Sequence, residues 1–351
     1  MIWPWGSRRP VRVGSFVFEA TRACNHSCLH CYNFWRGQIE AGPELDTVDT
    51  LVMLDRMIAQ TGARLVTISG GEPLLRKDIF EIVDHLAGRK IAVNFLTNGT
   101  LLDEAAIECL GGGKVSLFEL PLLSVQREVH DRLSGSPGAF DKLTLAIARL
   151  KSAAQRVVCV FVATRVNLPT WEQTIELAVA LGADGIMFNR FNPGGAAVGL
   201  GNIEQLQASP EELSAAMDIA NAAVEKYHIG ISCSIPMPQC LFDHARWPRL
   251  SFGYCAAGTA RAYYTLDALG NVRPCNHSPT VLGNIRTQTF KEMVQGAAMD
   301  AFAGARPPFC GGCKMELTCQ GGCKASAELC GGDLSGCDPF LAAFSHQARK
   351  L

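Results

Sequence analysis

The sequence predicts an α/β fold in which a partial barrel of parallel strands is followed by a smaller, cysteine-rich domain. Strand-like and helix-like segments alternate through the first two-thirds of the chain, and such alternation builds a parallel sheet. Past residue 231 the helical periodicity fades, while glycine, proline and cysteine become frequent. A chain of 351 residues is long enough for one large and one small domain. We therefore expect two domains, residues 1–230 and residues 231–351.

The barrel is expected from six successive strand–helix units. Such units curl into a partial (β/α)6 TIM-like barrel, although a doubly wound open sheet fits the same pattern. Glycines close the second strand at Gly70-Gly71, and an Asn98-Gly99 turn closes the third. The expected strands are Val13–Thr21, Leu65–Ser69, Ile91–Leu96, Val115–Leu123, Arg156–Val166 and Gly185–Phe191. The expected helices are Asp46–Gln60, Lys77–Leu86, Leu102–Leu110, Phe140–Ser152, Trp171–Leu181 and Pro210–Tyr227.

The C-terminal third has fewer regular elements. Residues Arg261–Cys275 predict a β-hairpin turning at Ala268–Asn271, and a short helix is expected over Thr289–Ala298. After Arg306 the chain consists mostly of small residues and cysteines. Such a segment cannot bury enough apolar surface to fold alone, so we expect bound metal to hold it together.

Composition excludes several classes of partner. The formal net charge is -1, so no basic excess indicates nucleic-acid binding. No stretch approaches the roughly 18 consecutive apolar residues of a membrane span, and no apolar run of signal-peptide length follows the N-terminal arginines. We therefore expect a cytoplasmic protein without a membrane or nucleic-acid partner.

Fifteen cysteines are many for a chain without an export signal. Cytosolic thiols stay reduced, so metal ligation explains the cysteines better than disulfides do. Cys109, on an expected helix, and Cys159, on an expected strand, fall outside every motif. We expect both to be structural, because free cysteine is commonly a small buried hydrophobe.

Three cysteines follow the first strand with the spacing C-x3-C-x2-C: Cys24, Cys28 and Cys31. Three thiolates on one loop can bind three irons of a cubane [4Fe–4S] cluster, which normally takes four cysteines. No fourth cysteine is nearby, so we expect one iron to be open to another ligand. A zinc site is the alternative, because His26 or His30 could complete a four-ligand set.

This loop, with the aromatic Tyr32 after its last cysteine, resembles the radical S-adenosylmethionine (SAM) superfamily. The resemblance implies that SAM chelates the open iron through its amino and carboxylate groups. Reductive cleavage of SAM then gives a 5′-deoxyadenosyl radical, which takes a hydrogen atom from the substrate. It also implies that Tyr32 lies beside the adenine, and that a reductase or flavodoxin-type protein donates electrons.

Segments at the ends of strands two and three carry the same resemblance. Gly70, Gly71 and Glu72 precede a proline, which matches the G-G-E-P segment that binds the methionyl amine in the family. Consecutive glycines allow close approach of a backbone to a ligand, and Glu72 could pair with the SAM ammonium. Asn98 lies in a segment that resembles the family pattern packed near SAM.

Strands four and six add two further candidates. Relatives often carry a serine on strand four that helps to hold the SAM carboxylate, and the matching position here is Pro121. Ser124 could take its place. Arg190, at the end of strand six, could meet the SAM carboxylate or the substrate; an ordinary salt bridge is the alternative.

Most of the remaining cysteines follow the spacing C-x14-G-x4-C, then C-x2-C-x5-C-x3-C, then a last cysteine. This pattern resembles the SPASM domain, which carries two auxiliary iron–sulfur clusters in some radical SAM enzymes. The last ligand is Cys337 or Cys330, with Cys337 preferred. The second auxiliary cluster, called proximal, has only three cysteines in the motif, so its fourth ligand is Cys240, Cys233 or a substrate group. The resemblance assigns Cys310, Cys313, Cys319 and Cys337 to the distal cluster, and Cys255, Cys275 and Cys323 to the proximal one.

The resemblance implies an enzyme that oxidatively modifies a ribosomally made peptide, by a crosslink or a thioether. A small substrate such as a sugar or a tetrapyrrole is the alternative. A zinc-binding scaffold and an electron carrier are more distant alternatives. The segment Gly70–Pro73 disfavours an electron carrier, because a carrier needs no SAM pocket. About a dozen residues precede the first strand, too few for a leader-binding domain. We therefore expect either a separate leader-binding protein or a small substrate.

Overall fold

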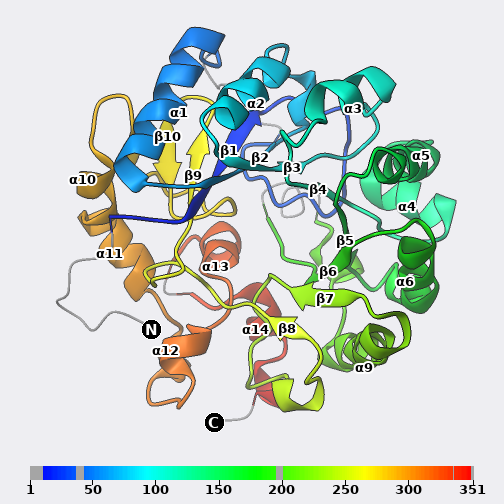
Figure 1. Cartoon of the computed structure of the whole chain (residues 1–351). Coiled ribbons are helices and arrows are strands. Elements are labelled where there is room, and N and C mark those ends of the chain that lie inside the picture. Colours follow the sequence, from blue (N-terminus) through cyan, green and yellow to red (C-terminus); the bar gives the residue numbers. More distant parts are fainter. Residues whose placement is uncertain (1–10, 37–42, 195–200, 335, 349–351) are drawn as a thin grey trace.

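One continuous curved sheet organises the computed structural model, which describes residues 11–36, 43–194, 201–334 and 336–348. Within these residues the strand order is β11-β10-β9-β1-β2-β3-β4-β5-β6-β7-β8. Figure 1 shows the sheet bent into an open barrel, with α1, α2, α3, α5, α6 and α9 on its outer face. The strands β1 to β6 follow one another without a switch point, so the partial barrel is confirmed and the doubly wound sheet is wrong.

The barrel strands are short runs rich in β-branched and aromatic residues. Strand β5 alternates buried and half-buried side chains, as expected for a strand between lumen and helices. The strands are β1 (Ser15–Thr21), β2 (Leu65–Gly70), β3 (Ala92–Leu96), β4 (Leu117–Leu120), β5 (Val157–Ala163), β6 (Gly185–Arg190), β7 (Gly230–Cys233), β8 (Ser251–Phe252), β9 (Tyr264–Asp267), β10 (Asn271–Arg273) and β11 (Gly283–Asn284).

Local capping interactions determine where many of the helices begin and end. Helix α9 begins with a capping box between Ser209 and Glu212, and it ends at His228 in the left-handed conformation. The longer barrel helices are α1 (Thr47–Thr61), α2 (Ile79–Gly88), α3 (Glu104–Leu110), α4 (Arg127–Ser134), α5 (Ala139–Ser152), α6 (Trp171–Ala180) and α9 (Pro210–Tyr227). The shorter or later helices are α8 (Ile203–Leu206), α10 (Phe290–Val294), α11 (Ala297–Gly304), α12 (Glu316–Cys319), α13 (Lys324–Gly331) and α14 (Pro339–Ala343).

The C-terminal third extends the barrel sheet at both edges. Strand β7 pairs in parallel with β6, and β9 pairs in parallel with β1 from Phe16–Tyr264 to Glu19–Asp267. The expected domain boundary after residue 230 therefore falls within β7. Figure 1 shows α13 and α14 between the two ends of the curved sheet.

Two buried ion pairs connect the barrel to this C-terminal region. Glu19 of β1 pairs with Arg273 of β10, and Arg190 of β6 pairs with Asp338, the residue before α14. All four side chains are almost completely buried. The C-terminal third is thus attached to the barrel by charge as well as by strand pairing.

Several expected boundaries are wrong for local reasons. Strand β4 ends at Leu120, because Pro121 follows it and has no N–H to continue the ladder. The helix expected over Thr289–Ala298 is two helices, α10 and α11, because Gly296 between them is extended. Helix α4 was not expected, nor were the short helices after Arg306.

The expected hairpin is confirmed, because β9 and β10 pair antiparallel. The side chain of Asp267 accepts hydrogen bonds from the backbone N–H groups of Leu269 and Asn271, both at 2.9 Å. Gly270 has φ +89°, a conformation that favours glycine. Among the described helices, none is both long and apolar enough to cross a bilayer.

Candidate active site and cluster sites

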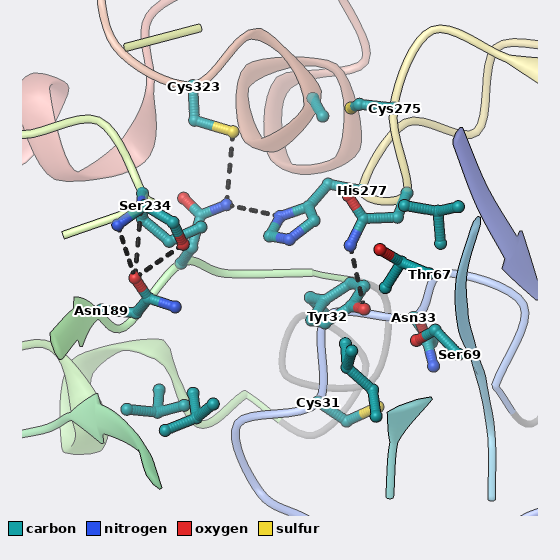
Figure 2. Close-up of a pocket in the computed structure, with 18 of the residues that line it drawn as sticks. Cys31, Tyr32, Asn33, Thr67, Ser69, Asn189, Ser234, Cys275, His277 and Cys323 are labelled. Atoms are coloured by element: carbon teal, nitrogen blue, oxygen red, sulfur yellow. Dashed lines mark hydrogen bonds between the residues drawn. The ribbon is translucent and has the colours of Figure 1, made fainter. Parts of the chain in front are cut away.

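A cavity of about 560 Å³ lies at the C-terminal ends of the barrel strands. One wall is the cysteine loop after β1, and the opposite wall comes from the C-terminal third. Figure 2 shows Cys31 and Tyr32 on the first side, Cys275 and Cys323 on the second, and His277 between them. The expected site residues that line the cavity are Cys24, Cys28, Cys31, Tyr32, Gly70, Gly71, Asn98, Arg190, Cys255, Cys275 and Cys323.

The two glycines after β2 press against the backbone that leads into the cysteine loop. A Cβ added to Gly71 would lie 2.0 Å from the carbonyl oxygen of Ala23, and one added to Gly70 would lie 2.5 Å from that of Thr21. The N–H of Gly71 donates to the Thr21 carbonyl at 2.8 Å. Only glycine fits this contact, so the segment fixes the start of the loop relative to the cavity.

The three thiols of this loop face the same cavity and influence one another electrostatically. Burial, followed by the thiols of Cys31 and Cys24, raises the pKa of Cys28 to about 12. A bound iron cluster would supply the positive charge that thiolates need in this buried setting. Three thiols from one loop that line the same cavity fit three irons of a [4Fe–4S] cluster.

Glu72 lies behind the cavity wall and is fully buried. Its carboxylate accepts hydrogen bonds from the Thr97 hydroxyl at 2.7 Å, the Asn98 N–H at 2.8 Å and the Leu74 N–H at 3.1 Å. Burial raises the pKa of Glu72 to about 6, although these donors oppose the rise. The described side chain thus joins the ends of β2 and β3, and it is absent from the residues that line the cavity.

This geometry gives a prediction for Glu72→Ala, in which SAM binding and folding stability fall together. The substitution leaves three donors unpaired and releases Asn98, which does line the cavity. We expect SAM affinity to fall about tenfold or more, since a hydrogen bond to a charged group contributes about 1.5–3 kcal/mol. Equilibrium SAM binding and thermal unfolding are measured on the same sample. Weaker binding at an unchanged unfolding temperature would instead indicate direct contact with SAM, and unchanged binding would remove Glu72 from the site.

Tyr32 is held by partners from the C-terminal third. Its ring stacks on that of His277 with centroids 4.0 Å apart, and its hydroxyl accepts a hydrogen bond from the Asn276 side chain at 3.0 Å. Burial raises the pKa of Tyr32 to about 12, so the hydroxyl stays protonated. The residue expected beside adenine therefore lies where the barrel meets the C-terminal third (Figure 2).

The structure does not bring Ser124 to the cavity. Ser124 is fully buried; its hydroxyl lies 2.9 Å from that of Thr170 and accepts from the Gln126 N–H at 3.0 Å. Pro121 lines the cavity instead. The chain leaves the barrel after β4, so a serine three residues beyond the proline binds the backbone of Gln126, the residue before α4, instead of facing the cavity.

Arg190 lines the cavity but is already paired. It forms a buried ion pair with Asp338, and its Nε donates to the Pro236 carbonyl at 2.8 Å. Its guanidinium also lies 4.9 Å from the centre of the Phe340 ring. The structure thus shows the salt bridge that was the alternative for this residue, although the partner is 148 residues away rather than in the same loop.

The three proximal cysteines converge on one side of the cavity. Cys255 follows β8, Cys275 follows β10 and Cys323 precedes α13, and all three line the cavity. Tyr263 is half-buried beside them, and its pKa is raised by desolvation and then by these thiols. The Asn192 side chain donates to the Cys323 sulfur at 3.2 Å. A thiol set from three distant elements is therefore assembled by the fold.

Most of the expected distal cysteines lie around a second cavity. This cavity of about 450 Å³ is lined by Cys310, Cys313, Cys319 and also Cys240. Cys240, one of the three alternatives for the fourth proximal ligand, thus lines the same cavity as the distal thiols. Cys233, another of these alternatives, is buried within β7 and lines neither cavity.

The last two cysteines, Cys330 and Cys337, interact with different thiol sets. The thiol of Cys337 interacts electrostatically with Cys310 and Cys240, and that of Cys330 with Cys323. Neither lines a described cavity. Cys337 is therefore nearer the distal set, as preferred, whereas Cys330 lies toward the proximal one.

Sequence reasoning missed three polar residues of the cavity. Burial alone raises the pKa of Glu119 to about 7, and this carboxylate lies at the cavity wall on β4. His277 and Asn192 form a chain from Tyr32 to Cys323, because the Asn192 amide is 2.9 Å from His277 Nδ1. A charged residue within an apolar strand and a histidine two positions after a motif cysteine were the available signals.

Comparisons with known proteins agree with this arrangement. Residues 18–178 match the radical SAM superfamily, and residues 255–320 match the SPASM iron–sulfur cluster-binding domain. The chain is 28% identical over 342 residues to an AdoMet-dependent heme synthase of Methanosarcina barkeri, covering 92% of this chain and 95% of that protein. It is 29% identical over 332 residues to a PqqA peptide cyclase of Granulibacter bethesdensis, covering 92% and 86%.

The fold is similar to that of a solved structure, Streptococcus suis SuiB bound to its precursor peptide SuiA. The TM-score is 0.74 at 14% identity, with 93% of this chain and 75% of that chain covered.

The fold, the loop of three cysteines and the family match define an iron–sulfur enzyme of the radical SAM superfamily. Within it, the chain belongs to the radical SAM enzymes with a C-terminal SPASM domain. Its cofactors are a [4Fe–4S] cluster that binds SAM, SAM itself and auxiliary iron–sulfur clusters.

Proposed function

We propose that this enzyme oxidatively modifies a ribosomally made peptide, forming a crosslink or a thioether after a hydrogen atom is taken from carbon. The names of the PqqA peptide cyclase and of SuiB with its precursor peptide support a peptide substrate. The two proteins resemble this chain over most of its length.

The proposal assigns roles to the residues around the cavity. Cys24, Cys28 and Cys31 hold the SAM-binding cluster, while Gly70 and Gly71 bring the β2 end close to the methionyl group. Tyr32, Asn98 and Arg190 form further walls of this pocket, with Arg190 held by its ion pair. The chemistry that the bound cluster supplies is reductive cleavage of SAM to a carbon radical.

The single observation that carries the proposal is the charge of the cavity lining. The described cationic side chains there are Arg36, Arg190 and Lys324. Arg190 is neutralised by Asp338, and Lys324 donates to the Ala303 carbonyl at 2.6 Å and to Gln320 at 2.8 Å. Arg36 donates to a backbone carbonyl. Of the described cations, only Arg36 and Lys324 would offer their charge to a tetrapyrrole with several carboxylates, because their acceptors named above are neutral. An uncharged stretch of peptide needs no cation.

The cavity volume points the same way. A volume of about 560 Å³ lies within the range for one drug-sized ligand. SAM would take a large part of this space, so the remainder suits a side chain better than a whole tetrapyrrole. The second candidate is nevertheless a tetrapyrrole, because the similar protein of Methanosarcina barkeri is named a heme synthase.

Oxidative modification also sets a requirement for electrons. Of the two hydrogens that the peptide loses, one leaves as an atom to form 5′-deoxyadenosine; the other leaves as a proton, and one electron remains. Cys255, Cys275 and Cys323 would hold an auxiliary cluster at the cavity wall, and this cluster would supply the electron acceptor. The proposal further includes a reductase or flavodoxin-type donor and a separate leader-binding protein.

The test supplies peptides encoded beside the gene to reconstituted enzyme, SAM and a reductant under anaerobic conditions. We expect the peptide to lose two hydrogens by mass while 5′-deoxyadenosine accumulates, and the yield to rise when a leader-binding protein is added. A Cys31→Ala variant is the matched control for background SAM breakdown. Coupling of SAM cleavage to a tetrapyrrole, a sugar or another small metabolite, with no peptide altered, would contradict the proposal.

A further inference from the structure

The side chain of Asn192 lies between the cysteine loop and the C-terminal third. Asn192 follows β6 by two residues, and only 5% of its surface is exposed. Its Nδ2 donates to the Cys323 sulfur at 3.2 Å and lies 2.9 Å from His277 Nδ1. Figure 2 shows these contacts as the dashed lines that end on Cys323 and His277. One amide group therefore contacts both a thiol of the proximal set and the histidine that stacks on Tyr32.

The partners of Asn192 determine which way its amide points. The Oδ1 atom lies 3.4 Å from Nη1 of Arg190, and a guanidinium can only donate. Oδ1 therefore faces Arg190, and Nδ2 faces Cys323 and His277. Because an amide nitrogen does not accept hydrogen bonds, His277 Nδ1 is the acceptor and the ring proton lies on Nε2. The network thus directs an N–H group of Asn192 at the Cys323 sulfur.

The backbone that carries Asn192 is held from two sides. The Ser326 hydroxyl of α13 donates to the Pro193 carbonyl at 2.8 Å. On the other side, a Cβ added to Gly194 would lie 2.4 Å from the Tyr32 carbonyl oxygen, so the two backbones are in close contact. The segment after β6 is therefore fixed between α13 and the cysteine loop, and the amide of Asn192 is preorganised.

A hydrogen bond to a ligand sulfur changes the reduction potential of an iron–sulfur cluster. Reduction adds one electron, and the sulfurs share the extra negative charge. An N–H donor stabilises the reduced form more than the oxidised form, because hydrogen bonds to more strongly charged groups are stronger. A donor fixed at the Cys323 sulfur would therefore make a cluster held by this thiol easier to reduce.

We propose that Asn192 raises the reduction potential of the proximal auxiliary cluster through its hydrogen bond to Cys323, and that His277 positions the amide. This inference rests on the proposed function, in which Cys255, Cys275 and Cys323 hold that cluster. One electron remains after the substrate has lost a hydrogen atom and a proton, and the Asn192 amide favours its transfer to the cluster. No bond to Asn192 forms or breaks in this step.

The test measures reduction potentials of the full chain, reconstituted with iron and sulfide, by a redox titration followed by electron paramagnetic resonance. Asn192→Leu removes the donor at similar size. We expect the proximal cluster to become about tenfold harder to reduce at a given ambient potential, a fall of about 59 mV for a one-electron couple. The proximal signal is the one that Cys323→Ser alters. The other two potentials should stay unchanged.

Electron–nuclear double resonance of the reduced cluster provides a second readout. The unmodified enzyme should show an exchangeable proton coupled to the proximal cluster, and Asn192→Leu should lose this coupling. Asn189→Leu is the matched control, because Asn189 also lines the cavity but its Oδ1 accepts from the Ser234 N–H at 2.9 Å instead of facing a thiol. The control should keep both the coupling and the proximal potential.

Two further variants cover a leucine that disturbs folding and test the positioning role. Asn192→Asp keeps the shape, but its carboxylate cannot donate and adds negative charge, so the proximal potential should again fall. His277→Phe keeps an aromatic ring beside Tyr32 and removes the Nδ1 acceptor, so its shift should have the same sign and be smaller.

An unchanged proximal potential in Asn192→Leu or Asn192→Asp with three clusters bound would overturn the inference. An equal shift in Asn189→Leu, or a Cys323→Ser variant that alters no cluster, would also overturn it. An unchanged potential in His277→Phe would overturn the role of His277. None of these measurements uses a substrate, so a small-molecule substrate would contradict the proposed function and leave the effect of Asn192 on the potential intact.

Discussion

Replacing Cys24, Cys28 and Cys31 together by alanine should abolish formation of 5′-deoxyadenosine while leaving the auxiliary clusters in place. The three thiols line one wall of the first cavity, and the other thiol sets come from separate elements. Iron content should therefore fall by about one-third, from roughly twelve to eight per chain if every cluster is [4Fe–4S]. SAM cleavage should fall to background, because no other described group replaces the cluster.

Iron analysis and a SAM cleavage assay on the same preparation check this result. Cys109→Ala, on the exposed face of α3, is the control and should keep both signals. Loss of all iron in the triple variant would show that the clusters do not assemble independently. Full SAM cleavage in that variant would contradict the assignment of the loop.

Asp338→Asn should destabilise the fold by about 3–5 kcal/mol, the usual cost of breaking a buried ion pair by removing one partner. The Asp338 carboxylate pairs with Arg190 and accepts a hydrogen bond from the Cys323 N–H at 2.8 Å. Asparagine keeps the shape but leaves the Arg190 guanidinium charged and buried. Denaturant unfolding of the reconstituted enzyme measures the change.

Two controls separate charge from shape. Asp141→Asn breaks an exposed pair with Arg127 and should change stability little. The double variant Arg190→Met/Asp338→Asn should unfold at higher denaturant concentration than Asp338→Asn alone, because it removes the uncompensated charge. Equal stability of Asp338→Asn and the unmodified enzyme would show that this pair does not hold the C-terminal third in place.

The sequence was informative where structure depends on local pattern. Strand–helix alternation predicted the six barrel strands, and the glycine turns predicted the places where β2 and β3 end at the cavity. Cysteine spacing predicted the thiol sets at Cys24–Cys31 and at Cys310–Cys319. These features depend on residues that are close together in the chain, so they can be predicted from a single sequence.

Long-range geometry is where the sequence stops being sufficient. It did not show that the Glu72 carboxylate is fully buried and hydrogen-bonded to Thr97 and Asn98, because the surroundings of a side chain depend on the neighbouring strand. Cys240 has no motif spacing, and only folding places it beside Cys319. The pairing of β1 with β9 likewise joins segments almost 250 residues apart, which no local pattern specifies.

That pairing has a consequence for how the protein is made. As the chain emerges from the ribosome, β1 can pair with β2 early, but its other edge stays open until residues 264–267 are synthesised. An open strand edge can pair with other chains, and contacts between distant segments form slowly. The newly made barrel is therefore exposed to aggregation until its C-terminal third arrives, so low yields in overexpression should improve with slower synthesis or with chaperones.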